Sequence, residues 1–266
     1  MKIFITGVTG FIGTHTAKHL KSRGFEVYGC GTGPVLREEL KPVLSGYNRM
    51  PLNGEFDAEV FKNIDAVVHG AYSLHRKNIK ATNIEGTLKW FRAAKEMGVK
   101  SQIFLTSYSA GPGTKSTYGA IKYELESFFL EEKQPVIRPG LVLGDGGLAR
   151  KMGKVLKSLP TIPLLDGGNY DVPIIQVEDL CLIIEAALNN PEPRVYQAFQ
   201  DEMVSMKALL QKMKQDLNTR CLFVPLPSII PLIFLKALET LHIPFPIKSD
   251  SIIALRTPAA HRLEKV

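Results

Sequence analysis

The chain has 266 residues, of which 45% are hydrophobic and 22% are charged. This composition is typical of a soluble globular protein, and it excludes the disordered and collagen-like classes. A chain of this length buries about three quarters of its unfolded surface, so it needs no disulfide or metal to hold its core together. The length fits one larger domain, or one domain with a small appendage.

The formal net charge is +7, which favours an anionic ligand or partner without identifying one. We expect a small-molecule substrate and no nucleic-acid partner. We also predict no metal, because the histidines form no ligand spacing with carboxylates. Cys30, Cys181 and Cys221 lie far apart and form no CxxC pair. Together with an N-terminus that runs straight into a strand, without a secretory signal, they indicate a reduced, cytoplasmic protein.

Along the chain, short apolar runs alternate with longer segments of helical period, which is the pattern of βαβ units and a parallel sheet. The expected strands span residues 2–6, 26–30, 66–69, 102–106 and 135–138. The expected helices span residues 12–22, 82–97, 118–131 and 177–188, and Gly98 is the C-terminal cap of the second helix. We therefore predict an α/β protein with a Rossmann-like, doubly wound parallel sheet and a small C-terminal substrate-binding region.

The regular alternation weakens after about residue 145, where prolines and glycines become frequent. We predict a dinucleotide-binding domain over residues 1–144, with its sheet completed by residues 174–199. Residues 145–266 would mainly form a smaller substrate-binding or cap region that is interleaved with the first domain.

The most apolar stretch, residues 221–235, contains Pro225, Pro227 and Pro231. Its 15 residues fall short of the roughly 20 that a membrane-spanning helix needs, and the prolines interrupt it. We expect this segment to be buried or to form a dimer contact. The alternatives are a peripheral contact with a membrane surface and the lining of a pocket for a less polar substrate.

A glycine-rich turn follows the first expected strand and opens the first expected helix, with the sequence Gly7-Val8-Thr9-Gly10-Phe11-Ile12-Gly13. Its glycines allow a tight turn and a close backbone approach to a pyrophosphate, and the helix N-terminus supplies N–H donors and the positive end of a dipole. In this strand–turn–helix context, the glycine spacing predicts a dinucleotide site. The alternative is a tight turn between two packed elements.

The spacing of the three glycines resembles that of the extended short-chain dehydrogenase/reductase family, in its NAD-dependent epimerase/dehydratase group. Later motifs resemble further landmarks of this family over roughly residues 1 to 215: Val67-Val68-His69-Gly70-Ala71, Asn83-Ile84-Glu85-Gly86-Thr87, Phe104-Leu105-Thr106-Ser107, Tyr118-Gly119-Ala120-Ile121-Lys122, Arg138-Pro139-Gly140 and Ile175-Gln176-Val177-Glu178-Asp179. The resemblance implies NAD or NADP as the cofactor, bound by Gly7, Thr9, Gly10, Phe11, Ile12, Gly13, Gly31, His69, Gly70, Ala71, Tyr118 and Lys122.

Tyr118 and Lys122 are four residues apart, so on a helix they share one face. A phenol has a pKa of about 10 and is a poor base at neutral pH, but a nearby ammonium favours the phenolate and lowers that pKa. The resemblance implies that this pair exchanges a proton with the substrate, that Lys122 also holds the nicotinamide ribose, and that Ser107 orients the reacting oxygen. Ser109 competes with Ser107 for this role. The alternative to the whole assignment is an incidental Tyr–Lys pair on a surface helix.

Three departures from the family pattern bear on the substrate. Ala110-Gly111-Pro112-Gly113 replaces the usual Val-Tyr-Gly ahead of the tyrosine, and Tyr108-Ser109 replaces the Asp-Glu pair of sugar 4,6-dehydratases. Leu141 and Val172 stand where the epimerases place an Asn and an Arg for the diphosphate of the substrate. Apolar side chains cannot compensate the desolvation of a phosphate, so these positions argue against the usual mode of binding a nucleotide sugar.

The leading functional hypothesis is an NAD(P)-dependent oxidoreductase or epimerase that transfers hydride at a secondary alcohol or ketone of a sugar or nucleotide sugar. One alternative is an NAD(P)H-dependent ketone reductase that acts on a less polar, non-nucleotide substrate. Another is a non-catalytic dinucleotide-binding subunit, against which the intact Ser107, Tyr118 and Lys122 argue.

The end of the second expected strand bears on the choice between NAD and NADP. An acidic residue there accepts the adenosine ribose hydroxyls and repels a 2′-phosphate, but this chain has Gly31 at that place. No Arg or Lys follows immediately, and Arg37 would have to fold back to reach a phosphate. We expect weak discrimination, with a lean towards NADP if Arg37 reaches the site.

We also predict a homodimer through the helices that contain residues 83–97 and 118–131. The apolar positions that motivate this prediction are Leu88, Phe91, Leu125, Phe128 and Phe129. The alternative is that these side chains only cover the sheet.

Overall fold

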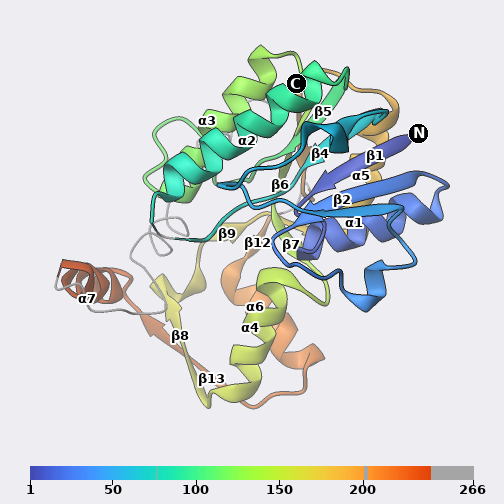
Figure 1. Ribbon diagram of the computed structural model, residues 1–266. Coiled ribbons are helices and arrows are strands. Elements are labelled where there is room, and N and C mark those ends of the chain that lie inside the picture. Colours follow the sequence, from blue (N-terminus) through green and yellow to red (C-terminus); the bar gives the residue numbers. More distant parts are fainter. Residues whose placement is uncertain (76, 201–202, 241–266) are drawn as a thin grey trace. The chain divides into compact units, whose positions relative to one another are not determined.

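A computed structural model of the chain describes residues 1–75, 77–200 and 203–240 (Figure 1). The chain divides into two compact units. Unit 1 comprises Met1–Ser107, Tyr123–Pro139 and Gln176–Ala198, and unit 2 comprises Tyr108–Lys122, Gly140–Ile175 and the chain from Phe199 onward. The five strands that the sequence predicts all lie in unit 1.

Unit 1 is built on a seven-stranded sheet in which all neighbouring strands are parallel. The strand order is β11-β6-β5-β4-β1-β2-β3, so the chain starts in the middle and winds outward in both directions. The strands are β1 Lys2–Thr6, β2 Glu26–Gly31, β3 Gly46–Arg49, β4 Ala66–His69, β5 Ser101–Leu105, β6 Val136–Pro139 and β11 Val195–Ala198. The Rossmann-like α/β class predicted from the sequence is thereby confirmed.

The five predicted strands fall within one residue of their observed bounds. The sequence pattern does not predict β3, which is an edge strand of partly or fully exposed residues that includes Asn48 and Arg49. An apolar run marks a strand that is buried on both faces, and an edge strand lacks that signal.

Helices cover both faces of the sheet, with α2 and α3 on one face and α1 and α5 on the other (Figure 1). Their bounds are α1 Phe11–Ser22, α2 Ile79–Glu96, α3 Thr117–Glu131 and α5 Val177–Asn189. Two short 3-10 helices, η1 Glu38–Leu40 and η2 Ala58–Phe61, lie in the connections around β3. Gly98 follows α2 with φ +87°, a left-handed conformation that glycine adopts without strain, so the predicted cap is confirmed.

The start of α2 differs from the sequence prediction, because the helix begins at Ile79 and not at residue 82. Asn83 stabilises this extra turn: its Nδ2 donates to the carbonyl oxygens of Ile79 at 2.8 Å and of Ser73 at 3.0 Å. Its Oδ1 accepts from the backbone N–H of Ser73 at 2.7 Å. Asn83 therefore ties α2 to the loop that follows β4.

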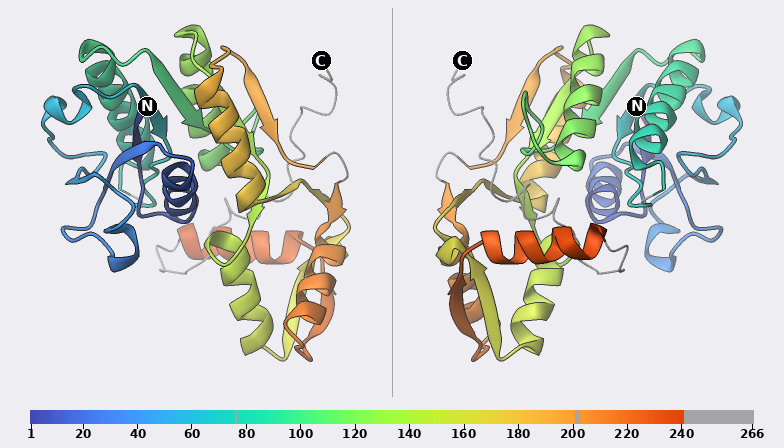
Figure 2. Two further views of the ribbon diagram at one scale, coloured as in Figure 1. Left: turned by 90° about the vertical axis from the view of Figure 1, so that its right-hand side faces the viewer. Right: turned by 90° about the vertical axis from the view of Figure 1, so that its left-hand side faces the viewer.

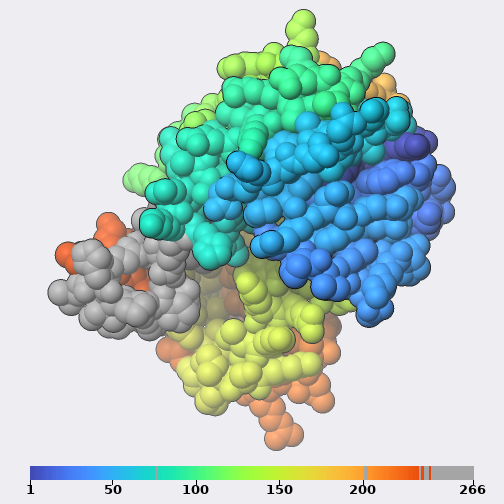
Figure 3. All heavy atoms as spheres, viewed as in Figure 1, coloured from blue at the N-terminus to red at the C-terminus, as the bar shows by residue number. Residues whose placement is uncertain are grey.

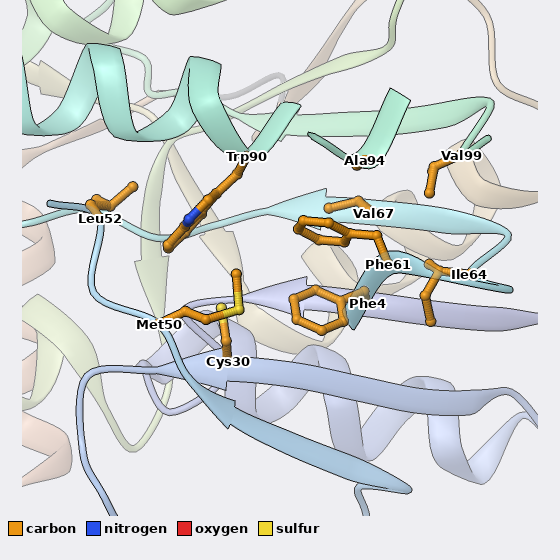
Figure 4. Close-up of a cluster of buried hydrophobic side chains, with 10 residues drawn as sticks. All are labelled: Phe4, Cys30, Met50, Leu52, Phe61, Ile64, Val67, Trp90, Ala94 and Val99. Atoms are coloured by element: carbon orange, nitrogen blue, oxygen red, sulfur yellow. The ribbon is translucent and has the colours of Figure 1, made fainter. Parts of the chain in front are cut away.

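The core between the sheet and α2 is a cluster of aromatic and aliphatic side chains (Figure 4). The rings of Phe4 and Phe61 meet edge to face with centroids 5.0 Å apart, and Trp90 of α2 is 1% exposed. Burying a large apolar side chain contributes roughly 1.5–3 kcal/mol. This packing fixes β1, from whose end the glycine-rich turn departs.

A buried ion pair joins α3 to β6. Arg138 donates from Nε and Nη2 to the two carboxylate oxygens of Glu126, with 3.3 Å between Nε and Oε2. Only 7% of the Arg138 side chain and 3% of the Glu126 side chain are exposed. Because an unpaired charge is strongly unfavourable in such a place, each of these residues requires the other.

The described part of unit 2 is an assembly of short strand pairs and helices. Its helices are α4 Gly147–Ser158, α6 Met206–Asp216 and α7 Ile229–Thr240, with the 3-10 helix η3 Asp166–Gly168 between strands. The strand pairs are β7 Leu141–Leu143 with β10 Ile174–Gln176, β9 Asp171–Val172 with β12 Val204–Ser205, and β8 Thr161–Leu165 with β13 Leu222–Leu226. An apolar cluster that includes Leu156, Ile162, Leu164 and Leu209 holds α4 and α6 against the β8–β13 ribbon (Figure 2).

The apolar stretch 221–235 forms β13 and the first part of α7. Cys221 and Leu235 are buried, but other large side chains of the stretch are between 47% and 66% exposed: Leu222, Val224, Ile229, Ile230 and Ile233. The segment is therefore not mainly buried within the chain, because on β13 only one face of the β8–β13 ribbon is covered. A dimer contact through this segment stays a prediction. In the described residues, no helix has the length and apolar character needed to cross a membrane. The part of the predicted C-terminal region beyond residue 240 lies outside the described residues.

The apolar side chains that motivate the dimer prediction mostly belong to the core of unit 1. Phe91, Leu125 and Phe129 are buried, and Phe129 stacks on Phe104 with ring centroids 4.8 Å apart. Leu88 and Phe128 are half-buried. These contacts agree with the alternative that the side chains cover the sheet, and the homodimer stays a prediction.

The Glu126–Arg138 pair generates a stability prediction. Glu126→Gln keeps the shape of the side chain but leaves Arg138 buried without a countercharge, so we expect a loss of about 3–5 kcal/mol in the free energy of unfolding. The matched control is Glu124→Gln, because Glu124 forms an exposed pair with Lys80 at 3.0 Å. Such surface pairs contribute about 0–1 kcal/mol. Urea denaturation measures both variants, and equal losses for the two would contradict the prediction.

Candidate active site

The β1–α1 turn brings backbone segments closer together than side chains would allow. Gly7 has φ +72°, and a Cβ there would lie 2.9 Å from the Cα of Ala71. A Cβ on Gly13 would lie 2.8 Å from the Cα of Val8 and even closer to the carbonyl oxygen of Gly7. Gly10 is less crowded: a Cβ there would meet only the carbonyl oxygen of Gly7, at 3.2 Å. The glycines predicted from the sequence therefore form one compact turn.

This turn fits the pyrophosphate of a dinucleotide. The helix α1 begins at Phe11 with Gly10 as its N-cap, no side chain caps it, and no acidic residue lies in its first turn. The first N–H groups of a helix lack partners within the helix, and they point outward at the positive end of its dipole. The backbone around Thr9, Phe11 and Ile12 can thus surround a phosphate group, with no capping side chain on the helix end and no carboxylate in its first turn.

The other wall of the turn comes from β4 and the residues that follow it. The side-chain oxygen of Thr6 accepts from the backbone N–H groups of Gly70 at 3.1 Å and Ala71 at 3.2 Å. This contact fixes the end of β4 against the end of β1. Thr6 does not appear in the motif-based prediction, although its place as the last residue of β1 is a usable signal.

His69 is a core residue. Its ring is 2% exposed, Nε2 lies 2.9 Å from Oε1 of Gln102, and the ring of Phe129 meets it edge to face. Burial lowers the pKa of His69 to about 4. The imidazole is therefore neutral at physiological pH and packs in the core, and its contact with a cofactor stays a prediction.

The end of β2 lies beside the glycine-rich turn. A Cβ on Gly31 would lie 2.7 Å from Oγ1 of Thr9 and 2.9 Å from the hydroxyl of Tyr47. A Cβ on Gly33 would make only ordinary contacts, the nearest with the carbonyl oxygen of Val35 at 3.6 Å. Gly31 therefore lets β2 approach the turn, and no acidic side chain occupies this place.

Arg37 folds back onto the turn. Its Nη2 donates to the carbonyl oxygen of Thr9 and to Oγ1 of Thr14, both at 2.6 Å, and its Nη1 lies 3.1 Å from Glu39. A second guanidinium flanks the same region, because Nε of Arg49 donates to the carbonyl oxygen of Thr32 at 3.3 Å. Two cationic side chains thus border the end of β2.

The catalytic residues predicted from the sequence fall on both sides of the division between the units. Ser107 is half-buried and is the last residue of unit 1, two residues after the end of β5. Tyr118 and Lys122 belong to unit 2. Ser109, the competitor of Ser107, also belongs to unit 2, where a Cβ on Gly119 would collide with its carbonyl oxygen.

The first turn of α3 has its own cap. Oγ of Ser116 accepts from the backbone N–H of Gly119 at 2.9 Å, and its carbonyl oxygen accepts from Ala120 at 2.9 Å. Ser116 is 1% exposed. Ser116 is the N-cap of α3, three residues before Gly119, and serine ahead of a helix is a signal that the sequence carries. The cap and the close approach at Gly119 fix the turn that carries Tyr118.

Lys122 follows Tyr118 by one turn of α3. Its Nζ lies 6.0 Å from the centroid of the Tyr118 ring, and the residue is only 4% exposed. Burial lowers the pKa of Lys122 to about 7 from its usual 10.5. An amine with this pKa is present in both protonation states near neutral pH, which suits proton exchange.

Comparison with known proteins gives a consistent picture. Residues 3–198 match the NAD dependent epimerase/dehydratase family. A UDP-glucose 4-epimerase of Klebsiella pneumoniae is 31% identical over 124 residues, which cover 40% of this chain and 89% of that protein. A PKS-NRPS hybrid synthetase of Aspergillus fumigatus, psoA, is 25% identical over 315 residues, and the match covers 98% of this chain but 8% of the synthetase.

Among solved structures, the UDP-glucose 4-epimerase of Thermus thermophilus in complex with NAD has the same fold. It aligns with a TM-score of 0.68 at 20% identity, over 96% of this chain and 97% of that one. The family match spans most of the chain and includes the glycine-rich turn and the Tyr118–Lys122 pair. The chain therefore belongs to the NAD-dependent epimerase/dehydratase family and is an NAD-dependent enzyme of that type.

Proposed function

We propose that this enzyme transfers hydride at a secondary alcohol or ketone of a sugar or nucleotide sugar, as an oxidoreductase or an epimerase. The observation that carries the proposal is the buried Lys122 one helical turn from Tyr118, with its Nζ 6.0 Å from the Tyr118 ring centroid. The UDP-glucose 4-epimerase of Klebsiella pneumoniae, which matches 40% of this chain, supports a sugar substrate.

In this proposal, Tyr118 exchanges the proton of the reacting hydroxyl or carbonyl and Ser107 holds the same oxygen by a hydrogen bond. Lys122 stabilises the negative charge on Tyr118 when it is protonated, and its lowered pKa lets it receive or return a proton near pH 7. The turn from Gly7 to Gly13 holds the pyrophosphate of the cofactor. The nicotinamide, when bound, supplies or accepts the hydride.

A second candidate function is the reduction of a ketone on a less polar substrate. Leu141 and Val172 stand where the epimerases place polar residues for a diphosphate, and both pack against the apolar cluster of unit 2. Side chains that are engaged in an apolar cluster cannot repay the desolvation of a phosphate. This observation favours a substrate without a diphosphate.

An activity assay distinguishes the two candidates. The full chain is incubated with NAD and UDP-glucose or UDP-galactose, and the sugar composition is followed by NMR. In parallel, oxidation of NADH and NADPH is followed with a series of ketones of increasing apolar character. Interconversion of the sugars supports the first candidate, and ketone-dependent oxidation without it supports the second. Cofactor binding without either activity would support the non-catalytic subunit.

Two further properties belong to the proposal. A reducing, cytoplasmic location is supported by Cys30, Cys181 and Cys221, which are buried free thiols. Burial raises the pKa of Cys30 to about 12 and that of Cys181 to about 11, so neither is a reactive thiolate at neutral pH. We further propose that unit 2 contributes the substrate-binding region.

Removing the hydroxyl of Tyr118 tests its role. We expect Tyr118→Phe to lower turnover by about 10²–10⁴-fold, because proton transfer by a placed side chain contributes about that much. Cofactor binding should stay at the wild-type level, since the ring remains. Steady-state kinetics and calorimetry measure the two effects, and wild-type turnover in the variant would show that Tyr118 is not the acid or base.

The lowered pKa of Lys122 predicts a pH dependence of stability. Between about pH 7 and pH 10.5 the unfolded chain binds a proton that the folded chain has released, so stability from this group rises with pH in that window. Lys122→Met removes the titrating group, so the stability of wild type relative to the variant should rise from pH 7 towards pH 10.5. Urea denaturation of the cofactor-free protein measures the difference. The exposed Lys115→Met is the control, and a pH-independent difference between wild type and Lys122→Met would contradict the assignment.

Arg37 makes the choice between NAD and NADP testable. We expect wild-type affinities for the two cofactors to lie within one or two factors of ten, each of which corresponds to about 1.4 kcal/mol. Arg37→Ala should weaken the binding of NADP more than that of NAD. Gly33→Asp should have the same effect, because its carboxylate repels the 2′-phosphate. Gly31→Asp is unsuitable, because its Cβ would collide with Thr9 and Tyr47. Calorimetric titration measures all affinities, and a thousandfold rejection of NADP by wild type would contradict our interpretation of β2.

A further inference from the structure

One end of unit 2 exposes large apolar side chains. Leu159, which follows α4 directly, is 47% exposed, and Leu222, the first residue of β13, is 66% exposed. The two residues are neighbours, because the backbone N–H of Leu222 donates to the carbonyl oxygen of Pro160 at 2.8 Å. Figure 2 shows the end of α4 and the starts of β8 and β13 together at this end of the unit.

The exposed apolar surface extends along both elements. On α4, Val155 lies one turn before Leu159 and is 44% exposed. On β13, Val224 lies two residues after Leu222, on the same side of the strand, and is 47% exposed. The register pairs Leu222 with Thr161 and Val224 with Pro163, both of which are also exposed. We call Val155, Leu159, Leu222 and Val224 the apolar tip.

Cationic residues are frequent in the segments that contain and precede the residues of the apolar tip. Residues 148–160 and 210–224 contain seven Lys and Arg residues but one carboxylate, Asp216. Arg150, Lys151, Lys154 and Lys157 are all exposed on α4, and the structure shows no ion pair between any of them and another described residue. In the space-filling view the yellow-green atoms of the α4 region lie at the surface (Figure 3).

This combination fits one kind of partner. Exposed apolar side chains at the end of a structural unit insert into the boundary between lipid head groups and acyl chains, while lysine and arginine reach the phosphates with their long side chains. Clustered cations add about 1 kcal/mol each near an anionic membrane surface. We propose that the apolar tip and the cations of α4 dock unit 2 onto an anionic phospholipid surface.

Charge argues against a second copy of the chain as the occupant. A two-fold contact places the same patch of both copies face to face. The cations of one α4 would then meet the cations of the other, and like charges brought together weaken an interface. An anionic lipid surface supplies the opposite charge over the whole face.

Vesicle co-sedimentation of the full chain tests the proposal. The probes are vesicles of phosphatidylcholine alone and of phosphatidylcholine mixed with phosphatidylserine, at low and at raised ionic strength. We expect binding to the mixed vesicles that weakens with salt, because screening shortens the range of the attraction. Lys154→Gln/Lys157→Gln should lower the partition coefficient about 25-fold, which is a factor of about five for each lysine. Leu159→Ser/Leu222→Ser should lower it at least about tenfold.

Matched double variants in unit 1 serve as controls. Leu74 and Leu182 are 76% and 53% exposed, so Leu74→Ser/Leu182→Ser removes as much exposed apolar surface elsewhere. Lys21→Gln/Lys100→Gln removes two exposed charges elsewhere. Both controls should bind like wild type, and circular dichroism checks that all variants are folded.

Several outcomes would overturn the proposal. These are no binding to the mixed vesicles, equal binding to the neutral ones, or the same loss in the control variants. Loss of vesicle binding in Lys154→Gln/Lys157→Gln but not in Leu159→Ser/Leu222→Ser would point to an acidic macromolecule in solution as the partner. A dimer that forms without vesicles and disappears in Leu159→Ser/Leu222→Ser would assign the face to a second copy.

Discussion

A Cβ on Gly13 would lie 2.8 Å from the Cα of Val8, and one on Gly7 would lie 2.9 Å from the Cα of Ala71. The glycine-rich turn depends on these two missing side chains. Without them β1, α1 and the residues after β4 can converge, and the N-terminus of α1 is left open at the point where the strands end. A dinucleotide needs both the close approach and the open helix end, so the small size of the two residues determines the fold here and also the proposed cofactor site.

The side chains around this turn serve the same backbone geometry. Thr6 holds the N–H groups of Gly70 and Ala71, and Arg37 holds the carbonyl oxygen of Thr9. Both contacts satisfy polar backbone groups, which would otherwise be unfavourable in a crowded turn. Arg37 thereby combines two tasks, because its guanidinium stabilises the turn and brings a positive charge to the end of β2, where the family often has a carboxylate.

The sequence predicts the parts of this structure whose signal is local. Apolar runs predict the five inner strands, Gly98 predicts the end of α2, and the glycine spacing predicts the turn between β1 and α1. Arg37 illustrates what local patterns miss, since its contact with Thr9 spans 28 positions and depends on how the chain returns from β2. The exposure of Leu222 and Val224 is missed for a related reason. An apolar strand looks the same in sequence whether its second face is covered or left open, and the cover belongs to other segments.

The helix α3 shows two ways in which a protein can bury an ionisable group. Arg138 donates from its guanidinium to both side-chain oxygens of Glu126, so two opposite charges compensate each other in the core. At Lys122, one turn earlier, burial lowers the pKa to about 7 and so favours the neutral amine. A group near its own pKa changes charge at little cost in free energy, which suits the proton exchange proposed for Lys122. The Glu126–Arg138 pair attaches the same helix to β6. Tyr118, Lys122 and Glu126 follow one another at intervals of four residues on α3, so the proposed chemistry and the anchor share one face of the helix.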